Sequence, residues 1–427
     1  MLVSSSMFQK TIFPNGLRLV TQTLASTKAA TVLILVGAGS RYETKEINGI
    51  SHFLEHMFFK GAKKYPTSRA VSETIDGMGG DFNAFTGKEY VGYYVKANAD
   101  HIDTSLDVLS DMLIHAKHDS VEIDKERNVI WEEYNMYLDT PMYQIGWDFE
   151  KLVYGDQPMG WDQVGTHDVI FSLKQEDFQK YQSELYTPDN LVVIITGNVT
   201  HEAMVEKVQK FFAELPNKKQ AYSHKDLQLH VAEKRVFLRT KKTEQSHICV
   251  GFPMVSEADP DYAAMKVLSV ILGGGMSSRM FMSVREDKGL AYYTHSSVDG
   301  FTDSGLFTTN AGVDVKRIDD ALAAVIGEYD KVTQELVPEK ELRKAKEYIK
   351  GKTILKLEDC EEYAHLLGKY DVLYGKIRTP DELLEEIEKV TAEDLLRLAK
   401  QFFVREKMFI SVIGPYEDEA QFTKFLG

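Results

Sequence analysis

The pentapeptide 52–56, H-F-L-E-H, holds residues whose types and spacing could do chemistry. His52 and His56 are four positions apart, so on a helix they share one face, and both imidazoles can reach one metal ion. Glu55 lies on the same side of that helix, next to any water or substrate group bound to the ion. Imidazoles suit zinc, and a carboxylate beside an ion-activated water suits hydrolysis. The motif H-x-x-E-H, the reverse of the commoner H-E-x-x-H, therefore indicates metal-assisted hydrolysis.

The flanking residues predict that this pentapeptide lies on a short, mostly buried helix. Asn48 is a candidate N-cap, and Gly61 is suited to a C-terminal stop. Apolar residues recur at helical spacing, at Ile50, Phe53, Leu54, Met57 and Phe58. Two neutral imidazoles that face inward need a polar partner, and a zinc ion would supply one.

A catalytic zinc site needs a third protein ligand and one open position. Residues 120–134 are predicted to form a helix capped by Ser120, and this helix carries Glu126, Glu132 and Glu133. Glu126 and Glu133 are two turns apart and share a face. Spacing alone does not choose among the three glutamates, and a solvated acidic helix face is the ordinary meaning of such a run.

These residues resemble the pitrilysin/insulinase family of zinc peptidases. The resemblance is closest to its short members, the mitochondrial processing peptidase beta subunits and their bacterial relatives. The segment 52–61, HFLEHMFFKG, is similar to the active-site helix of the family, and 126–133, ERNVIWEE, is similar to the segment that contains its zinc-binding glutamate. The resemblance implies that Glu133 is the third ligand beside the two histidines, and that Glu126 supports a ligand from outside the coordination sphere.

Two further motifs extend the resemblance over both halves of the chain. Residues 81–86, DFNAFT, are similar to the edge strand of the family, whose main chain at Asn83 and Ala84 would pair with extended substrate. Residues 272–279, LGGGMSSR, followed by Arg285 and Tyr292, are similar to its second-half motif. There the arginine and tyrosine would contact the scissile peptide.

The composition is that of a soluble globular enzyme. A length of 427 residues predicts about two to three domains. The net charge of −15 argues against nucleic-acid binding. Two remote cysteines, Cys249 and Cys360, exclude a disulfide framework and a cysteine-rich structural zinc site. No apolar run approaches a membrane span, and the N-terminus has neither a signal-peptide pattern nor an Arg-rich transit pattern.

An internal repeat predicts two homologous halves. Residues 172–199 align with 389–416 without a gap at an offset of 217, which matches acidic and apolar positions and a closing glycine. Both segments are predicted to form a capped helix followed by a buried strand. The offset is half the chain, so each half has about 210 residues.

We expect each half to be an α+β unit with a largely antiparallel sheet covered by helices on one face. The predicted domains are 1–215, with the zinc site, and 227–427, with Arg285 and Tyr292, joined by a polar linker at 216–226. Residues 261–268, which match the metal helix, contain no histidine or glutamate pair, so only the first half can bind zinc.

The expected activity is that of a zinc endopeptidase with one Zn²⁺ per chain. It would hydrolyse peptides, including basic ones, and unfolded segments within an enclosed chamber. Glu55 would act as the general base and acid. We expect a homodimer, or a heterodimer with a related subunit, in a bacterial cytoplasm, without nucleic-acid or membrane partners. Two alternatives stay open: a catalytically silent scaffold or partner subunit of a processing-peptidase-like complex, and a zinc hydrolase that does not cleave peptides.

Overall fold

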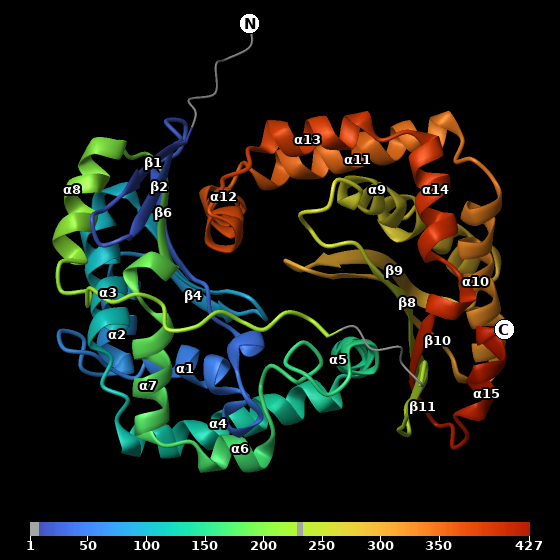
Figure 1. The fold of residues 1–427 in the computed structure, drawn as a ribbon, viewed down its shortest axis with the longest axis horizontal. Helices are drawn as coiled ribbons and strands as arrows, with labels where there is room; N and C mark the ends of the chain where they lie inside the picture. The colour runs from blue at the N-terminus through green and yellow to red at the C-terminus, as the bar shows by residue number, and fades with distance from the viewer. Residues whose placement is uncertain (1–7, 229–233) are drawn as a thin grey trace, which may run out of the picture. The chain divides into compact units, whose positions relative to one another are not determined.

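The computed structural model describes residues 8–228 and 234–427, whose strands form two sheets (Figure 1). The N-terminal sheet has the order β1-β2-β6-β3-β5-β4, in which β2 and β6 are parallel and the other neighbours antiparallel. Its strands are β1 (Gln9–Ile12), β2 (Arg18–Thr23), β3 (Ala29–Val36), β4 (Asp81–Thr86), β5 (Val91–Asn98) and β6 (Leu191–Gly197). The central strand β3 is apolar almost throughout because both of its faces are buried. The edge strand β4 has exposed and partly buried residues instead.

The C-terminal sheet repeats this topology. Its order is β7-β11-β8-β10-β9, with β7 and β11 parallel and the other neighbours antiparallel. Its strands are β7 (Val236–Thr240), β8 (Gln245–Met254), β9 (Ala291–Gly300), β10 (Gly305–Asp314) and β11 (Phe409–Gly414). Without β1, the two sheets match strand for strand, and β4 and β9 hold the same edge position. The predicted α+β fold with two homologous halves is confirmed.

Helices pack against both sheets. Those grouped with the N-terminal sheet are α1 (Ile50–Phe58), α2 (Ser68–Gly77), α3 (Ile102–His115), most of α4 (Ser120–Asp139), α6 (His167–Ser172), α7 (Gln175–Leu185), α8 (His201–Phe211) and α12 (Cys360–Tyr374). Those grouped with the C-terminal sheet are α5 (Pro141–Tyr154), α9 (Tyr262–Gly273), α10 (Ile318–Gln334), most of α11 (Glu339–Lys356), α13 (Pro380–Lys389), α14 (Ala392–Phe402) and α15 (Ala420–Thr423).

The repeated helix and strand lie where the internal alignment predicts them. The bounds of α7 and α14 differ by 217 positions at both ends, and β6 and β11 end at Gly197 and Gly414. The two helices also begin alike. Asp177 accepts a hydrogen bond from the backbone N–H of Lys174 at 2.8 Å, and Asp394 accepts one from that of Thr391 at 3.0 Å. In each case an aspartate in the first turn satisfies a backbone donor at the helix start.

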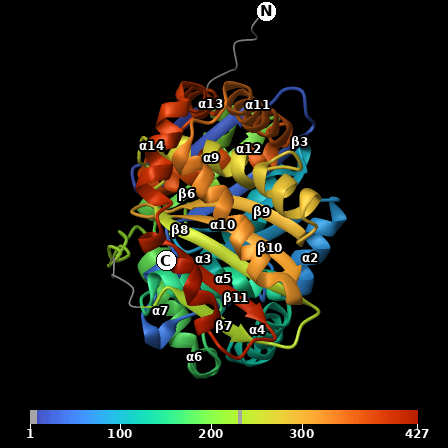
Figure 2. The same ribbon diagram turned by 90° about the vertical axis from the view of Figure 1, so that its right-hand side faces the viewer.

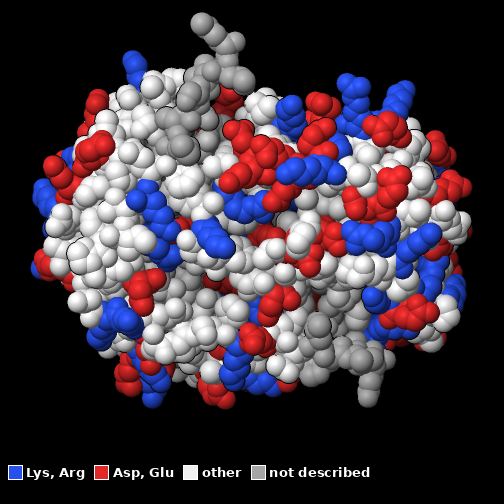
Figure 3. Space-filling model, turned by 45° about the horizontal axis from the view of Figure 1, so that its top comes forward, with Lys and Arg blue, Asp and Glu red and all other residues white. Residues whose placement is uncertain are grey.

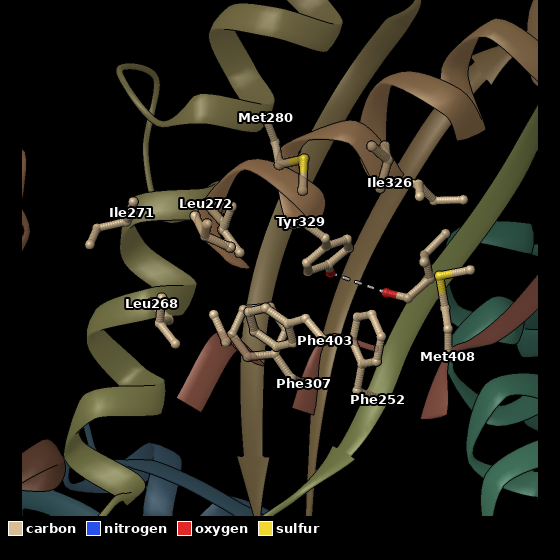
Figure 4. Packing of buried hydrophobic residues seen from close by; sticks show 14 of the residues in the cluster. Phe252, Leu268, Ile271, Leu272, Met280, Phe307, Ile326, Tyr329, Phe403 and Met408 are labelled. Atoms are coloured by element: carbon tan, nitrogen blue, oxygen red, sulfur yellow. Dashed lines mark hydrogen bonds between the residues drawn. The ribbon is translucent and has the colours of Figure 1, made fainter. Parts of the chain in front are cut away.

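The C-terminal sheet packs one face against α9, α10 and α14 (Figures 1 and 2). Figure 4 shows the aromatic centre of this core, where Phe252, Phe307 and Phe403 surround Tyr329. The buried Tyr329 hydroxyl donates a hydrogen bond to the Val250 carbonyl at 3.4 Å, so its polar atom has a partner inside the core. This layer corresponds to the covered face that the sequence predicts.

The second face of each sheet is covered by a helix from the other half of the sequence. On the N-terminal sheet, Leu33, Leu35 and Ile194 pack against Ala364 and Leu367 of α12. On the C-terminal sheet, the corresponding cluster is Cys249, Leu306, Phe409 and Ile413 with Ile145 and Phe149 of α5. In Figure 1, α12 lies across the N-terminal sheet from α1, α3 and α7. The two halves have therefore exchanged equivalent helices.

This exchange means that the compact units differ from the predicted halves 1–215 and 227–427. The first unit combines the described residues up to Tyr134 with 161–225 and 354–379, and the second combines 135–160 with 226–353 and 380–427. One of the points at which the chain passes from the first unit to the second, 225/226, lies inside the predicted linker 216–226. A single cut in the chain cannot separate the units, because α5 and α12 would remain with the wrong sheet.

Separate expression of residues 1–215 and 227–427 should therefore give two poorly soluble fragments. Each fragment lacks the helix that covers one apolar sheet face, and exposed apolar faces of this kind promote association. Co-expression should restore a soluble 1:1 complex, measured by gel filtration. The control is the full chain with a protease recognition site inserted at 217–223. After cleavage at this site, the two pieces should stay associated. Two independently folded, monomeric fragments would contradict the exchange.

Two surface properties complete the description. None of the helices in the described part of the chain is long and apolar enough to cross a lipid bilayer. Acidic and basic side chains are interspersed over the face drawn in Figure 3.

Candidate metal centre

The helix that carries the pentapeptide is α1, and it lies where the sequence predicts it. Its apolar side is fully buried, with Phe53, Leu54, Met57 and Phe58 each at most 1% exposed, whereas His52, Glu55 and His56 keep partial exposure. Phe53 packs edge-on against Phe178 of α7 at 4.8 Å between ring centroids. The apolar side thus anchors α1 and leaves the three polar residues on its other side.

The predicted N-cap at Asn48 is wrong. The N-cap is Gly49, whose φ of 96° favours glycine, and no side chain of that residue can cap the helix. The buried carboxylate of Glu43 replaces it, accepting hydrogen bonds from the backbone N–H groups of Gly49 at 2.7 Å and Ser51 at 2.9 Å. The Asn48 side chain donates to the same carboxylate at 2.9 Å. Burial raises the pKa of this carboxyl group, and the hydrogen bonds that it accepts from Ser51, Gly49 and Asn48 oppose that effect.

The predicted acidic helix is α4, and it begins at Ser120 as expected but extends to Asp139. Its cap differs from the prediction. The carboxylate of Asp119 accepts hydrogen bonds from the backbone N–H groups of Val121 at 2.9 Å and Glu122 at 3.4 Å, so Asp119 rather than Ser120 caps the helix.

The structure brings His52 and His56 of α1 together with Glu133 of α4. One ligand atom from each lies within 4.8 Å of the other two, and no other group of three or more such residues occurs in the described ranges. Glu133 Oε2 is 3.3 Å from His56 Nε2 and 3.6 Å from His52 Nε2. Two ligands that are each about 2.0–2.1 Å from one tetrahedral zinc ion lie about 3.3 Å apart. The spacing and chemistry of these donors therefore fit a zinc ion.

The three candidate glutamates lie in different environments. Glu132 is exposed and Glu133 faces the histidines. Glu126 is buried and accepts a hydrogen bond from His56 Nδ1 at 2.9 Å, which leaves Nε2 of that ring directed at Glu133. A carboxylate on the second nitrogen of a metal-binding histidine is the usual arrangement. Lys60 Nζ pairs with the other carboxylate oxygen of Glu126, Oε2, at 2.6 Å.

The electrostatics of the cluster favour a bound cation. Burial alone would lower the pKa of His56, but its hydrogen bonds to Glu126 and Glu133 and the charges of Glu133 and Glu55 outweigh burial and raise this pKa to about 9. The pKa of Glu133 is lowered by its hydrogen bonds to His52 and His56. The carboxylates that hold a proton on the imidazole would equally attract a divalent cation.

Glu55 has a partner that the motif does not reveal. Its Oε2 accepts a hydrogen bond from the hydroxyl of Thr86 at 2.5 Å. Thr86 is the last residue of β4, so the strand at the edge of the sheet contacts the glutamate between the two histidines. Asn83 and Ala84 lie in the middle of the same strand, and their outer edge has no strand partner in the described part of the chain.

Arg285 and Tyr292 lie close together in the second unit. Arg285 belongs to a π-helical segment, Phe281–Asp287, and Tyr292 to the edge strand β9. The guanidinium lies 4.7 Å from the ring centroid of Phe281 and 5.9 Å from that of Tyr292, whose side chain is 73% exposed. The three residues of the candidate metal site belong to the first unit. A catalytic role for Arg285 and Tyr292 therefore stays a prediction.

Sequence reasoning missed three residues that support the site: Glu43, Lys60 and Thr86. Lys60 and Thr86 lie within motifs that the sequence does single out, four positions after the second histidine and at the end of the edge strand. Their proximity to those motifs could have indicated them. Glu43 precedes α1 by seven positions, which is beyond the reach of ordinary capping patterns, and the sequence contains no comparable signal for it.

Two family models match successive segments of the chain. Residues 18–150 match a family model described as Insulinase (Peptidase family M16), and residues 172–349 match one described as Peptidase M16 inactive domain. In the second segment, α9 replaces the metal helix and contains neither histidine nor glutamate. Only the first of the two matched segments therefore carries the H-x-x-E-H residues.

Relatives and solved structures extend the match over almost the whole chain. The uncharacterized zinc protease YmxG of Bacillus subtilis is 36% identical over 94% of this chain and 97% of its own. An uncharacterized zinc protease of Streptomyces coelicolor is 36% identical over 96% and 90%. A protease from Helicobacter pylori has the same fold, with a TM-score of 0.88 at 23% identity, covering 96% of this chain and 99% of the other. With its two matched M16 segments and its H-x-x-E-H helix, the chain belongs to the pitrilysin/insulinase family of peptidases, M16, as a short-form member.

Proposed function

We propose that this protein is a zinc-dependent endopeptidase that hydrolyses extended peptides and unfolded polypeptide segments. The observation that carries the proposal is the arrangement around Glu55. This glutamate lies on the helix that presents two histidines to Glu133, and it is hydrogen-bonded to the last residue of an edge strand. Metal ligands, a proton carrier and a surface for extended chains are thus combined within one unit. The names of the relatives, zinc proteases, agree with this proposal.

His52, His56 and Glu133 would hold the ion, and Glu126 would keep the His56 ring oriented. When bound, zinc supplies Lewis-acid chemistry, which acidifies water and polarises a carbonyl. Glu55 then accepts the proton of the attacking water and returns it to the leaving amine. We assign this proton to Glu55 Oε1, because Oε2 already accepts the Thr86 hydroxyl.

The substrate would bind as an added strand along β4. Its outer edge offers backbone groups at Asn83 and Ala84. Main-chain pairing of this kind depends on the backbone of the substrate more than on its sequence. An extended peptide can pair in this way, whereas a folded domain has no free strand to offer. The net charge of −15 favours basic peptides among the possible substrates.

The second unit would contribute two residues to the site, which would lie in an enclosed chamber. We assign Arg285 and Tyr292 to the carbonyl oxygen of the scissile bond, where a cation and a hydroxyl would stabilise the developing negative charge. The assembly would be a homodimer, or a heterodimer with a related subunit, in the cytoplasm. These assignments rest on the family resemblance and on the exposure of Tyr292 beside the Arg285 guanidinium.

Arg285→Ala should keep its zinc and lower peptide turnover by about 100-fold, the usual effect of removing one oxyanion donor. The measurement combines elemental zinc analysis with cleavage of a mixed peptide library. Arg343→Ala is a matched control, because Arg343 is an exposed arginine of α11 in the same unit. The control should behave as wild type.

The same assay should include a stable folded domain, which should resist cleavage while short peptides are cut. Wild-type protein that binds zinc but cuts no peptide would indicate a silent scaffold or partner subunit instead. Hydrolysis of small non-peptide substrates, with no loss of activity after substitutions at Asn83 and Ala84, would indicate a zinc hydrolase of another kind. Rapid cleavage of the folded domain would refute the closed chamber.

A further inference from the structure

The register of β4 and β5 divides the residues of the edge strand between two environments. Ala84 pairs with Tyr93, whose ring contacts Phe58 of α1 at 5.2 Å between centroids. Ala84 and the residues two positions from it on β4 therefore have side chains on the face of the sheet toward the metal helix. Thr86, two positions after Ala84, lies on the same face. The alternate residue Phe85 contacts His365 of α12 at 5.3 Å, on the opposite face of the sheet. Thr86 is therefore the last residue of β4 that points to the metal helix.

The hydroxyl of Thr86 uses this position to hold Glu55. Oγ1 donates to Glu55 Oε2 at 2.5 Å, and a hydrogen bond to a charged carboxylate is among the stronger kinds. Glu55 immediately precedes His56 on α1 and follows His52 by three positions, which makes Glu55 and His52 neighbours on the helix surface. A carboxylate without the Thr86 bond would be free to turn toward the histidines. The hydroxyl directs it toward the strand instead.

We propose that Thr86 is a positioning residue that couples substrate binding to the orientation of Glu55. The inference rests on the proposed function, in which peptides pair with the main chain of β4 and Glu55 carries the proton. Under that function, one residue contributes its backbone to the strand that receives the substrate and its side chain to the general base. Pairing of a peptide along β4 restrains Thr86, and that restraint reaches Glu55 through a single hydrogen bond.

Thr86→Val tests this coupling, because valine keeps the β-branched shape and strand preference of threonine but lacks the hydroxyl. We expect unchanged zinc content, a value of kcat lowered by about 10- to 100-fold through loss of orientation, and a KM within about twofold of wild type. Thr86→Ser, which keeps the hydroxyl, should recover most of kcat. Thr74→Val is the matched control, since the Thr74 hydroxyl donates to the carbonyl of Ala70 within α2.

A crystal structure of each variant without metal gives a second readout that does not depend on activity. Glu55 should occupy one rotamer in wild type and Thr86→Ser, and more than one in Thr86→Val. An unchanged kcat, a loss of zinc in Thr86→Val, or equal damage in the serine variant would overturn the positioning role. Absence of peptidase activity in wild type would overturn the proposed function instead, while the rotamers of Glu55 would still decide whether Thr86 positions it.

Discussion

Glu55→Gln should bind zinc as well as the wild-type chain and lose at least about 100-fold of its peptide turnover, because removal of general-base catalysis has this effect. The glutamate lies on α1 between the two histidines but outside the group of three ligand atoms. Glutamine keeps its size and can still accept the Thr86 hydroxyl, but it cannot take a proton from water at neutral pH. The measurement is kcat on a library peptide together with elemental zinc analysis.

Glu73→Gln is the matched control for this substitution. Glu73 is an exposed residue of α2, paired with Arg69, and it has no contact with the metal cluster in the structure. Its variant should keep full activity. If Glu55→Gln retained half of the wild-type turnover, Glu55 would not be the proton carrier. If it lost its zinc, Glu55 would be a ligand rather than a base.

Glu133→Gln should lose its zinc or bind it far more weakly, because a neutral amide replaces the one anionic ligand of the cluster. Glu132→Gln should keep its zinc, since this side chain is exposed and lies about 100° around the helix from Glu133. Glu126→Gln should fall between the two, with zinc affinity lowered by about 10- to 100-fold, as is typical of partners that orient a ligand.

Competition with a chelator, followed by zinc analysis, orders the three variants on one scale. Thermal unfolding without metal measures any damage to the fold, and Glu133→Gln should unfold at or slightly below the wild-type temperature, because it loses the charged partner of the two histidines. Greater loss of zinc in Glu132→Gln than in Glu133→Gln would contradict the helix register seen in the structure. Equal losses at Glu126 and Glu133 would mean that Glu126 binds the ion itself.

The features that the sequence predicted correctly are those with local causes. The helix period alone places His52, Glu55 and His56 on one side of α1, because side chains three and four positions apart are neighbours on any helix. The same holds for the repeat, since α7 and α14 follow identical spacing rules and begin with equivalent aspartates. Such features need no knowledge of what the helix packs against.

Residues whose role depends on contacts between distant segments were left open or missed. The spacing in α4 left Glu126, Glu132 and Glu133 as alternatives, because the pattern does not say which side of α4 meets α1, and only the family resemblance selected Glu133 as the ligand. Glu43 caps α1 from outside the turn that precedes it, so a local capping rule chose Asn48 instead. Each contact joins segments whose proximity is a result of packing.

The helix exchange shows the same limit on a larger scale. The sequence by itself determined that two α+β halves exist, that only the first contains the H-x-x-E-H helix, and that each half has one sheet face to cover with helices. Apolar burial is not directional, so the sequence of α5 or α12 does not specify which sheet it covers. Only the tertiary structure decided that α12 covers the N-terminal sheet and α5 the C-terminal one, that Glu133 meets the two histidines, and that Thr86 of β4 holds Glu55.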